Sequence, residues 1–388
     1  MLMTTPKKSP PSAPPPPSDL VTRTSKVCGY SLIGLLGVGL ISCGWLLVSG
    51  KVQMLPPNLT RDAAMHGDVT HRIAKQLSNA WFPEQAANLE RGASWLLFHD
   101  TGPRVRPGCQ GWLFLTDEMR INHHARANAE AKAQAVIDVQ RRLSQRGIQL
   151  LVAVVPDKSR IAAEQLCGLD RPAELAPRVA EWTATLNQAG VSALNLAPTL
   201  QPLGASAYLR TDTHWSEIGS NAVARAIAHQ VQAMGIHATP QKTFVTLTNP
   251  AALRAGDLVH LAGIDWLPLS WQPTVETVAA TQVSEQPQAA QDGGDNLDDL
   301  FGDEGLPNVA LIGTSFSRNS NFVGFLELAL GAPVGSFAKD GGEFSGGANQ
   351  YFSNPAFRET PPKLLIWEIP ERDLQTPYEA IGMLSEKE

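Results

Sequence analysis

Two short segments carry the residue types of a nucleophilic site. In the first, Asp212 and His214 are two positions apart, so in an extended or looped backbone the carboxylate can accept the imidazole Nδ1–H and leave Nε2 as a base. In the second, an apolar run ends at Gly313 and is followed by Ser315. A serine on a strand-to-helix turn is exposed and lies near free backbone N–H groups. Together the segments contain the parts of a Ser-His-Asp hydrolytic or acyl-transfer site.

Each segment alone also has a plainer interpretation. An Asp-x-His pair can be a surface turn or half of a metal site, and a serine after glycine is often a helix N-cap. No third ligand lies at helical spacing and neither H-E-x-x-H nor C-x-x-C occurs, so we predict no metal. The acidic stretch 292–304 lacks the spacing of a calcium loop and is expected to be solvated. No nucleotide motif occurs, and no bound cofactor is predicted.

The elements around these segments alternate between strands and helices. Apolar runs predict strands at 149–155, 191–196, 308–312 and 363–369, with a short strand at 111–115, and helical periodicity predicts helices at 125–146, 173–189, 217–234 and 321–330. This alternation is typical of a mostly parallel sheet covered by helices on both faces. Open α/β sheets place their sites at the carboxyl ends of the strands, where both segments are expected. The polar, acidic stretch 279–305 is predicted to be a flexible insertion.

The amino-terminal part indicates a membrane-anchored, exported protein. Residues 1–26 form a basic, proline-rich tail, and 27–50 are uncharged and long enough to span a membrane as an uncleaved anchor. The positive-inside rule keeps the tail cytoplasmic and exports residues 51–388. Residues 51–104 are expected to form membrane-proximal helices ahead of a catalytic domain at 105–388. Lipidation at Cys43, within a lipoprotein-like box, is the alternative for the anchor.

Charge and cysteine content narrow the function further. The net charge of −6 argues against a nucleic-acid-binding protein. Cys109 and Cys167 lie in the exported part, where an oxidising compartment permits a disulfide between them. Two unpaired thiols are the alternative.

Several motifs, in order and in spacing, resemble the AlgJ/AlgX group of alginate O-acetyltransferases. They are the segment 208–215, Gly313-Thr-Ser-Phe-Ser317, the strand 111–115, Val155-Pro-Asp-Lys158, Gly256-Asp-Leu258 and Trp367-Glu-Ile-Pro-Glu-Arg372. The resemblance implies a variant of the SGNH hydrolase fold, a three-layer α/β/α structure. It also implies Ser315 as nucleophile, His214 as general base and acid, and Asp212 as the group that orients it. Only sixteen residues follow Arg372, which favours the membrane-tethered AlgJ-type form over one with a carbohydrate-binding module.

Other residues are candidates for supporting roles. The Ser315 amide and the backbone of Gly341 and Gly342 could form an oxyanion hole, or the two glycines only a tight turn. Trp215 either stacks on a sugar or packs against the sheet.

Charged side chains near the motifs are further candidates. Lys158 and Arg318 could steer an anionic polymer, although Lys158 follows a Pro-Asp turn at a strand end and could instead be only a capping residue. Glu368 and Arg372 are expected to form a structural ion pair.

We therefore expect an O-acetyltransferase that modifies a secreted polysaccharide, alginate or another glycan, in the periplasm through an acetyl-serine. The resemblance implies a membrane-bound O-acyltransferase partner as acetyl source and residence at the inner membrane. Two alternatives remain open: an esterase with the same triad, which uses water as acceptor, and a non-catalytic subunit that binds or tethers polysaccharide.

Overall fold

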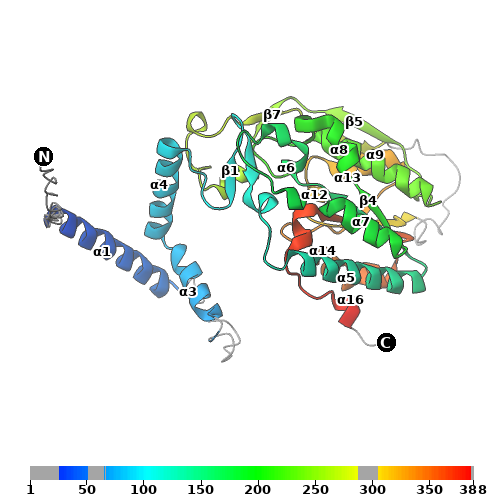
Figure 1. Ribbon diagram of the computed structural model, residues 1–388, viewed down its shortest axis with the longest axis horizontal. Coiled ribbons are helices and arrows are strands. Elements are labelled where there is room, and N and C mark those ends of the chain that lie inside the picture. The colour runs from blue at the N-terminus through cyan, green and yellow to red at the C-terminus, as the bar shows by residue number, and fades with distance from the viewer. Residues whose placement is uncertain (1–25, 51–64, 66, 287–304, 386–388) are drawn as a thin grey trace, which may run out of the picture. The chain divides into compact units, whose positions relative to one another are not determined.

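The computed structural model describes residues 26–50, 65, 67–286 and 305–385 (Figure 1). The chain divides into two compact units, residues 1–87 and 88–388. The division falls within helix α4 (Trp81–Phe98). The predicted tail at 1–25 and the acidic residues 287–304 lie outside the described residues.

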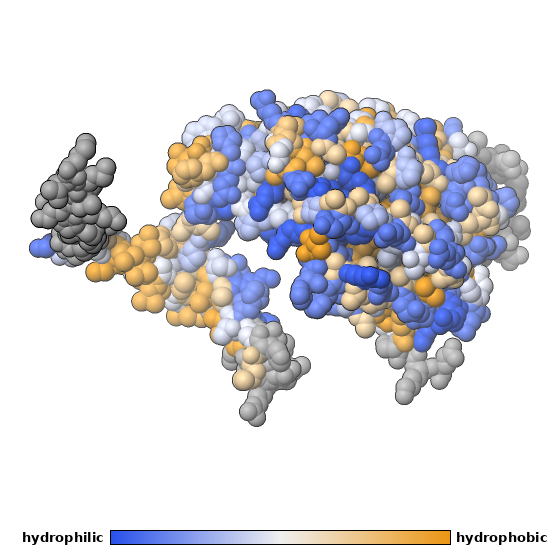
Figure 2. Space-filling model, viewed as in Figure 1, coloured by the Kyte–Doolittle hydropathy of each residue, from blue (hydrophilic) through white to orange (hydrophobic). Residues whose placement is uncertain are grey.

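The first unit contains the predicted membrane span. Helix α1 (Lys26–Val48) is long and apolar enough to cross a membrane, and Figure 2 shows its apolar surface. None of its residues is buried against other parts of the protein. Helices α3 (Asp68–Ser78) and α4 (Trp81–Phe98) follow, as the sequence predicts for the region after the span.

A parallel five-stranded sheet organises the second unit. Its strands are β3 (Gln149–Val155), β4 (Ser192–Asn195), β9 (Val309–Ile312), β10 (Gly335–Ser336) and β11 (Leu364–Pro370), in the order β10-β9-β11-β3-β4. The central strands β3 and β11 pair along their whole length, from Gln149 with Leu364 to Val155 with Pro370. Because helices cover both faces, these strands are apolar almost without alternation. The predicted mostly parallel sheet is confirmed, with β10 as an additional edge strand.

Helices lie on both faces of this sheet and complete the three layers. One core contains the inward faces of α9 (Glu217–Ala233) and α13 (Phe322–Leu330). The core on the other face contains those of α5 (Ala125–Gln145), α7 (Arg178–Gln188) and α14 (Gly346–Phe352). Shorter helices connect these elements: α6 (Lys158–Ile161), α8 (Ala197–Leu200), α10 (Asp257–Leu261), α12 (Ser315–Arg318), α15 (Pro355–Glu359) and α16 (Gly382–Ser385).

Two predicted elements differ from the structure. The helix expected at 173–189 starts only at Arg178, after a 3-10 turn at Ala173–Leu175, because Pro177 cannot continue a helix from the preceding residues. The insertion expected to be flexible from residue 279 begins instead with a strand, β8 (Thr281–Glu285). This strand pairs with β5 (Phe244–Thr248). Amino-acid composition could not predict the strand, because its hydrogen bonds are to a segment distant in sequence.

Two further antiparallel pairs flank the sheet. Strands β1 (Val105–Pro107) and β2 (Leu113–Leu115) form one, and of these β2 lies within the short strand predicted at 111–115. Strands β6 (Ala252–Arg254) and β7 (Glu276–Val278) form the other. The β1–β2 turn is tied down by a disulfide between Cys109 and Cys167, with an S–S distance of 2.01 Å. The pairing expected from the export argument is thus the one that the structure has.

Candidate active site

The nucleophile turn joins β9 to α12. Thr314 caps α12, and its Oγ1 accepts a hydrogen bond from the Phe316 N–H at 3.3 Å. Gly313 is required here, because a Cβ at this position would lie 2.6 Å from Glu368 Oε2. Ser315 therefore begins a helix after the carboxyl end of β9 and is partly exposed, as the strand-to-helix pattern predicts.

The buried carboxylate of Glu368 fastens this turn to β11. It accepts hydrogen bonds from the Thr314 N–H at 2.7 Å and the Ser317 hydroxyl at 3.0 Å. Burial raises the pKa of Glu368, and these hydrogen bonds oppose the rise.

The predicted ion pair between Glu368 and Arg372 is wrong. The Arg372 guanidinium lies over the Phe316 ring, 5.1 Å from its centroid, and 3.9 Å from Glu118. A helical spacing of four does not apply, because Glu368 is in a strand.

The three predicted triad side chains form one hydrogen-bonded row. His214 Nε2 lies 2.8 Å from Ser315 Oγ, and His214 Nδ1 lies 2.6 Å from Asp212 Oδ1. The same carboxylate oxygen accepts the His214 backbone N–H at 2.9 Å. Burial favours the neutral acid, but the hydrogen bonds from His214 outweigh it and lower the pKa of Asp212 to about 2. The carboxylate is therefore charged at neutral pH and can stabilise an imidazolium.

Lys158 holds the loop that carries Asp212 and His214. Its buried ammonium donates hydrogen bonds to the carbonyl oxygens of Leu113, Arg210 and Asp212 at 2.7, 2.8 and 3.0 Å. Burial lowers the pKa of Lys158 to about 8. A side chain without solvent exposure cannot steer a polymer, so the steering role considered for Lys158 is wrong. The alternative, a backbone-capping role, fits the three carbonyl contacts.

Two charged residues next to the triad were missed by the sequence analysis. Asp257, in the Gly256-Asp-Leu258 motif, accepts hydrogen bonds from the N–H and the hydroxyl of Thr213 at 2.7 and 2.5 Å, and its Oδ2 is 3.7 Å from His214 Nδ1. Burial and the charge of Asp212 raise the pKa of Asp257. Arg254 lies 3.6 Å from Asp212 Oδ2 and donates to Asn319. The Gly256-Asp-Leu258 motif contains Asp257, but the sequence did not predict which residues its carboxylate contacts.

The fold also supplies the third metal-type ligand that the sequence spacing lacks. Asp212, His214 and Asp257 each offer a ligand atom, and these atoms lie within 4.8 Å of one another. However, both nitrogens of His214 have hydrogen-bond partners, Asp212 and Ser315. A cation on Nδ1 would replace the shortest bond of the row, so the donor set suits a triad better than a metal centre.

The oxyanion-hole candidates have different outcomes. The neighbouring N–H groups of Thr314, Phe316 and Ser317 have acceptors, whereas none is recorded for Ser315 N–H within the described part of the chain. The Gly342 N–H donates to the Lys339 carbonyl at 3.1 Å, which closes a tight turn. Gly342 is therefore corrected from a donor to a turn residue, while Gly341 is exposed in the left-handed region, with φ 62°.

The other two substrate-binding candidates lie in contrasting surroundings. Trp215 is fully buried between Phe316 and Phe322, with ring centroids 5.0 and 4.8 Å away, so stacking on a sugar is wrong and packing is correct. Adjacency to His214 does not bring the indole into the site, because neighbours in an extended segment point to opposite sides. Arg318 is exposed and lies 3.3 Å from Asp340, so its side chain remains accessible to an anionic ligand.

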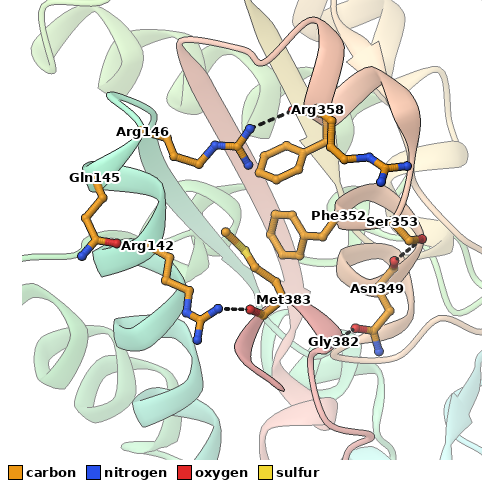
Figure 3. A pocket seen from close by; sticks show the side chains of 10 residues that line it. Arg142, Gln145, Arg146, Asn349, Phe352, Ser353, Arg358, Gly382 and Met383 are labelled. Carbon is orange, nitrogen blue, oxygen red and sulfur yellow. Dashed lines mark hydrogen bonds between the residues drawn. The ribbon is translucent and has the colours of Figure 1, made fainter. Parts of the chain in front are cut away.

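A pocket of about 470 Å³ at the other end of the sheet carries several arginines (Figure 3). Arg146 stacks on Phe357 at 4.3 Å, and Arg142 donates to the Met383 carbonyl. Arg146 lies just before β3, at the amino ends of the strands. Because Ser315 follows the carboxyl end of β9, this pocket is separate from the triad.

Comparisons with known proteins agree with this geometry. The family model described as "SGNH hydrolase-like domain, acetyltransferase AlgX" matches residues 105–371. The protein named probable alginate O-acetylase AlgJ from Pseudomonas aeruginosa is 31% identical over 354 residues, covering 89% of this chain and 87% of that protein. Its namesake from Pseudomonas putida is also 31% identical, with 91% of each covered.

Solved structures show the same relationship. The O-acetyltransferase domain of Pseudomonas putida AlgJ aligns with a TM-score of 0.62 and 27% identity, covering 72% of this chain and 95% of that one. Pseudomonas aeruginosa AlgX, at 24% identity and a TM-score of 0.54, shares the fold. The chain belongs to the AlgX-type family of SGNH hydrolase-like acetyltransferases.

Proposed function

We propose that this enzyme O-acetylates alginate, a polyuronate, through an acetyl-Ser315 intermediate. The observation that carries the proposal is the hydrogen-bonded row Asp212–His214–Ser315 at the carboxyl end of β9. The relatives named alginate O-acetylase, similar over most of their length, support the polymer and the acetyl group. The exposed guanidinium of Arg318 is consistent with an anionic acceptor.

The geometry supports a two-step transfer. Ser315 Oγ attacks the carbonyl carbon of an acetyl donor while its proton passes to His214 Nε2, and the donor's leaving group departs with that proton. A sugar hydroxyl then attacks the acetyl-serine, gives its proton to His214, and leaves as the ester while Ser315 recovers the proton. Asp212 stabilises the imidazolium in both steps, and the Ser315 N–H, which has no acceptor among the described residues, can donate a hydrogen bond to the developing oxyanion.

The amino-terminal helix supports a location at a membrane. Helix α1 could be an anchor or a signal sequence by length and composition. We propose that it anchors the chain in the inner membrane with residues 51–388 in the periplasm, because the basic residues precede it. A membrane-bound O-acyltransferase would then supply acetyl groups to Ser315 from the same membrane.

The test uses the full chain in detergent with a small aryl acetate as donor and uronate oligomers as acceptor. We expect a mass gain of one acetyl on wild type, none on Ser315→Ala, and acetyl on the oligomer faster than free acetate. Release of acetate alone would support the esterase alternative. A well-folded protein without an adduct or turnover would refute the catalytic role and favour the tethering one.

A further inference from the structure

A second pocket, of about 250 Å³, lies beside the loop that carries the triad acid and base. It is formed by the end of α4, the β1–β2 turn and the loop 272–274, all within the second unit. Neither Asp212, His214 nor Ser315 lines it. Its aromatic and polar lining residues are Trp95, His99, Gln110, Trp112, Gln272 and Thr274.

Two of the rings in this pocket are held in fixed positions. The Trp95 indole Nε1–H donates to the Trp271 carbonyl at 2.7 Å, which sets the plane of the ring. The His99 imidazole lies 5.2 Å from the Trp95 ring, and His99 has φ 55°, a left-handed conformation uncommon for a residue with a side chain. The aromatic wall is therefore in place before any ligand binds, which reduces the entropy cost of binding.

The opposite wall is also rigid. Cys109 is disulfide-bonded to Cys167, and its N–H donates to the Gln165 carbonyl at 2.8 Å. The Trp112 N–H in turn donates to the Cys109 carbonyl at 2.8 Å, which closes the turn that carries Gln110. The polar side chains of this turn are thus presented from a fixed backbone.

The chemistry of the lining indicates the class of ligand. No acidic, lysine or arginine side chain lines the pocket. The exposed Gln110 amide has no recorded hydrogen bond among the described residues, and Gln272 uses its Nε2 on the Asp265 carbonyl, which leaves its Oε1 as an acceptor. Aromatic faces combined with neutral donors and acceptors suit a ligand that has an apolar C–H face edged by hydroxyls, and a pyranose ring is such a ligand.

Short contacts connect the pocket to the catalytic loop. Leu113 lines the pocket, and the Lys158 ammonium that binds its carbonyl also binds the carbonyl of Asp212. A Cβ added at Gly111 would lie 3.8 Å from Arg210 Nη1, so a guanidinium stands at the rim on this side. This guanidinium lies 3.6 Å from Glu276 and is only partly exposed, and it places a cation beside the pocket that a uronate carboxylate can contact.

We propose that this pocket is an acceptor subsite, which holds one pyranose ring of the polysaccharide while Ser315 acetylates another. The inference rests on the proposed function and adds to it, because it predicts that acceptor length matters. The alternative is that this region contacts a membrane surface through exposed tryptophans such as Trp266 and Trp271. The pocket is concave and rich in amides, which favours the glycan.

The test uses the full chain in detergent and a double variant, His99→Ala with Gln110→Ala. Both side chains are exposed, so the fold should persist, and the melting temperature checks this. We expect KM for long uronate oligomers to rise about tenfold, the size of change that losing a ring contact and a hydrogen bond produces. The rate of acetyl-Ser315 formation from a small aryl acetate, kcat, and KM for the shortest acceptor should stay unchanged. Trp266→Ala, an exposed indole outside the pocket, is the matched control.

Three results would overturn the subsite. They are an unchanged KM for long oligomers, an equal loss with all acceptor lengths, and an equal rise in Trp266→Ala, which would indicate a surface effect at the detergent boundary. If wild type acetylates no oligomer, the proposed function fails separately. Binding of the same oligomers to Ser315→Ala, with and without the pocket substitutions, then decides the subsite: weaker binding supports it, and equal binding refutes it.

Discussion

Replacing Asp212 by Asn separates the charge of the triad acid from its orienting role. Asp212 Oδ1 accepts both the His214 N–H and the Nδ1–H, at 2.9 and 2.6 Å. An Asn in the same rotamer can keep both bonds through its single carbonyl oxygen. Its amide NH2 would then face Arg254, which lies 3.6 Å from Oδ2 without a hydrogen bond. Two retained bonds outweigh that one unfavourable contact, so we expect His214 to keep its tautomer.

The expected loss follows from the pKa of Asp212, which is lowered from 3.8 to about 2. A shift of about two units corresponds to roughly 2.5 kcal/mol of preferential interaction with the charged form. Losing that from the transition state slows the reaction roughly a hundredfold. Asp212→Ala removes the orienting bonds as well, and loss of the correct tautomer in such a triad costs about 10⁴-fold.

The assay is single-turnover formation of acetyl-Ser315 from a small aryl acetate, followed by intact mass. We expect Asp212→Asn to fall between wild type and Asp212→Ala, about a hundredfold from each. A loss in Asp212→Asn as large as in Asp212→Ala would refute the reasoning, because it would mean that the amide flips and the tautomer is lost. An Asp212→Asn rate equal to wild type would show that the carboxylate charge does not contribute.

Three further substitutions test the groups that hold the site. Glu368→Ala should lower the free energy of unfolding by about 2–3 kcal/mol and slow acetyl-Ser315 formation, because the buried Thr314 N–H and Ser317 hydroxyl lose their shared acceptor; denaturant unfolding unchanged from wild type would contradict this. Lys158→Met should cost about 3 kcal/mol near pH 7, because three carbonyls lose their donor. Since burial lowers the pKa of Lys158 from 10.5 to about 8, the folded state binds fewer protons than the unfolded state between those pH values, so wild-type stability should rise there and that of Lys158→Met should not. Cys109→Ser should lower the free energy of unfolding by about 4 kcal/mol, the chain-entropy value for a cross-link that spans 58 residues. A reducing agent should lower the free energy of unfolding of wild type by the same amount and leave that of the variant unchanged.

The sequence was sufficient for the parts of the protein that depend on local patterns. The apolar runs that became β3, β9 and β11 are buried on both faces, so each reads as a strand without reference to its partners. The Asp212–His214 spacing and the serine after a strand are equally local, and the structure brings them together at one edge of the sheet. The errors at 173–189 and 279–285 arose where a proline or a distant pairing strand decided the outcome.

Tertiary structure alone decided which side chains face the site. Trp215 and Lys158 stand beside catalytic motifs in sequence but point into the core, and Glu368 binds the nucleophile turn 54 residues away instead of Arg372. Asp257 and Arg254 reach the triad from separate elements, and no spacing rule connects them to it. The sequence by itself therefore determined the chemistry and the sheet, because both follow from short-range pattern. The surroundings of the triad came only from the fold, because burial and contact depend on which segments, distant along the chain, pack against each other.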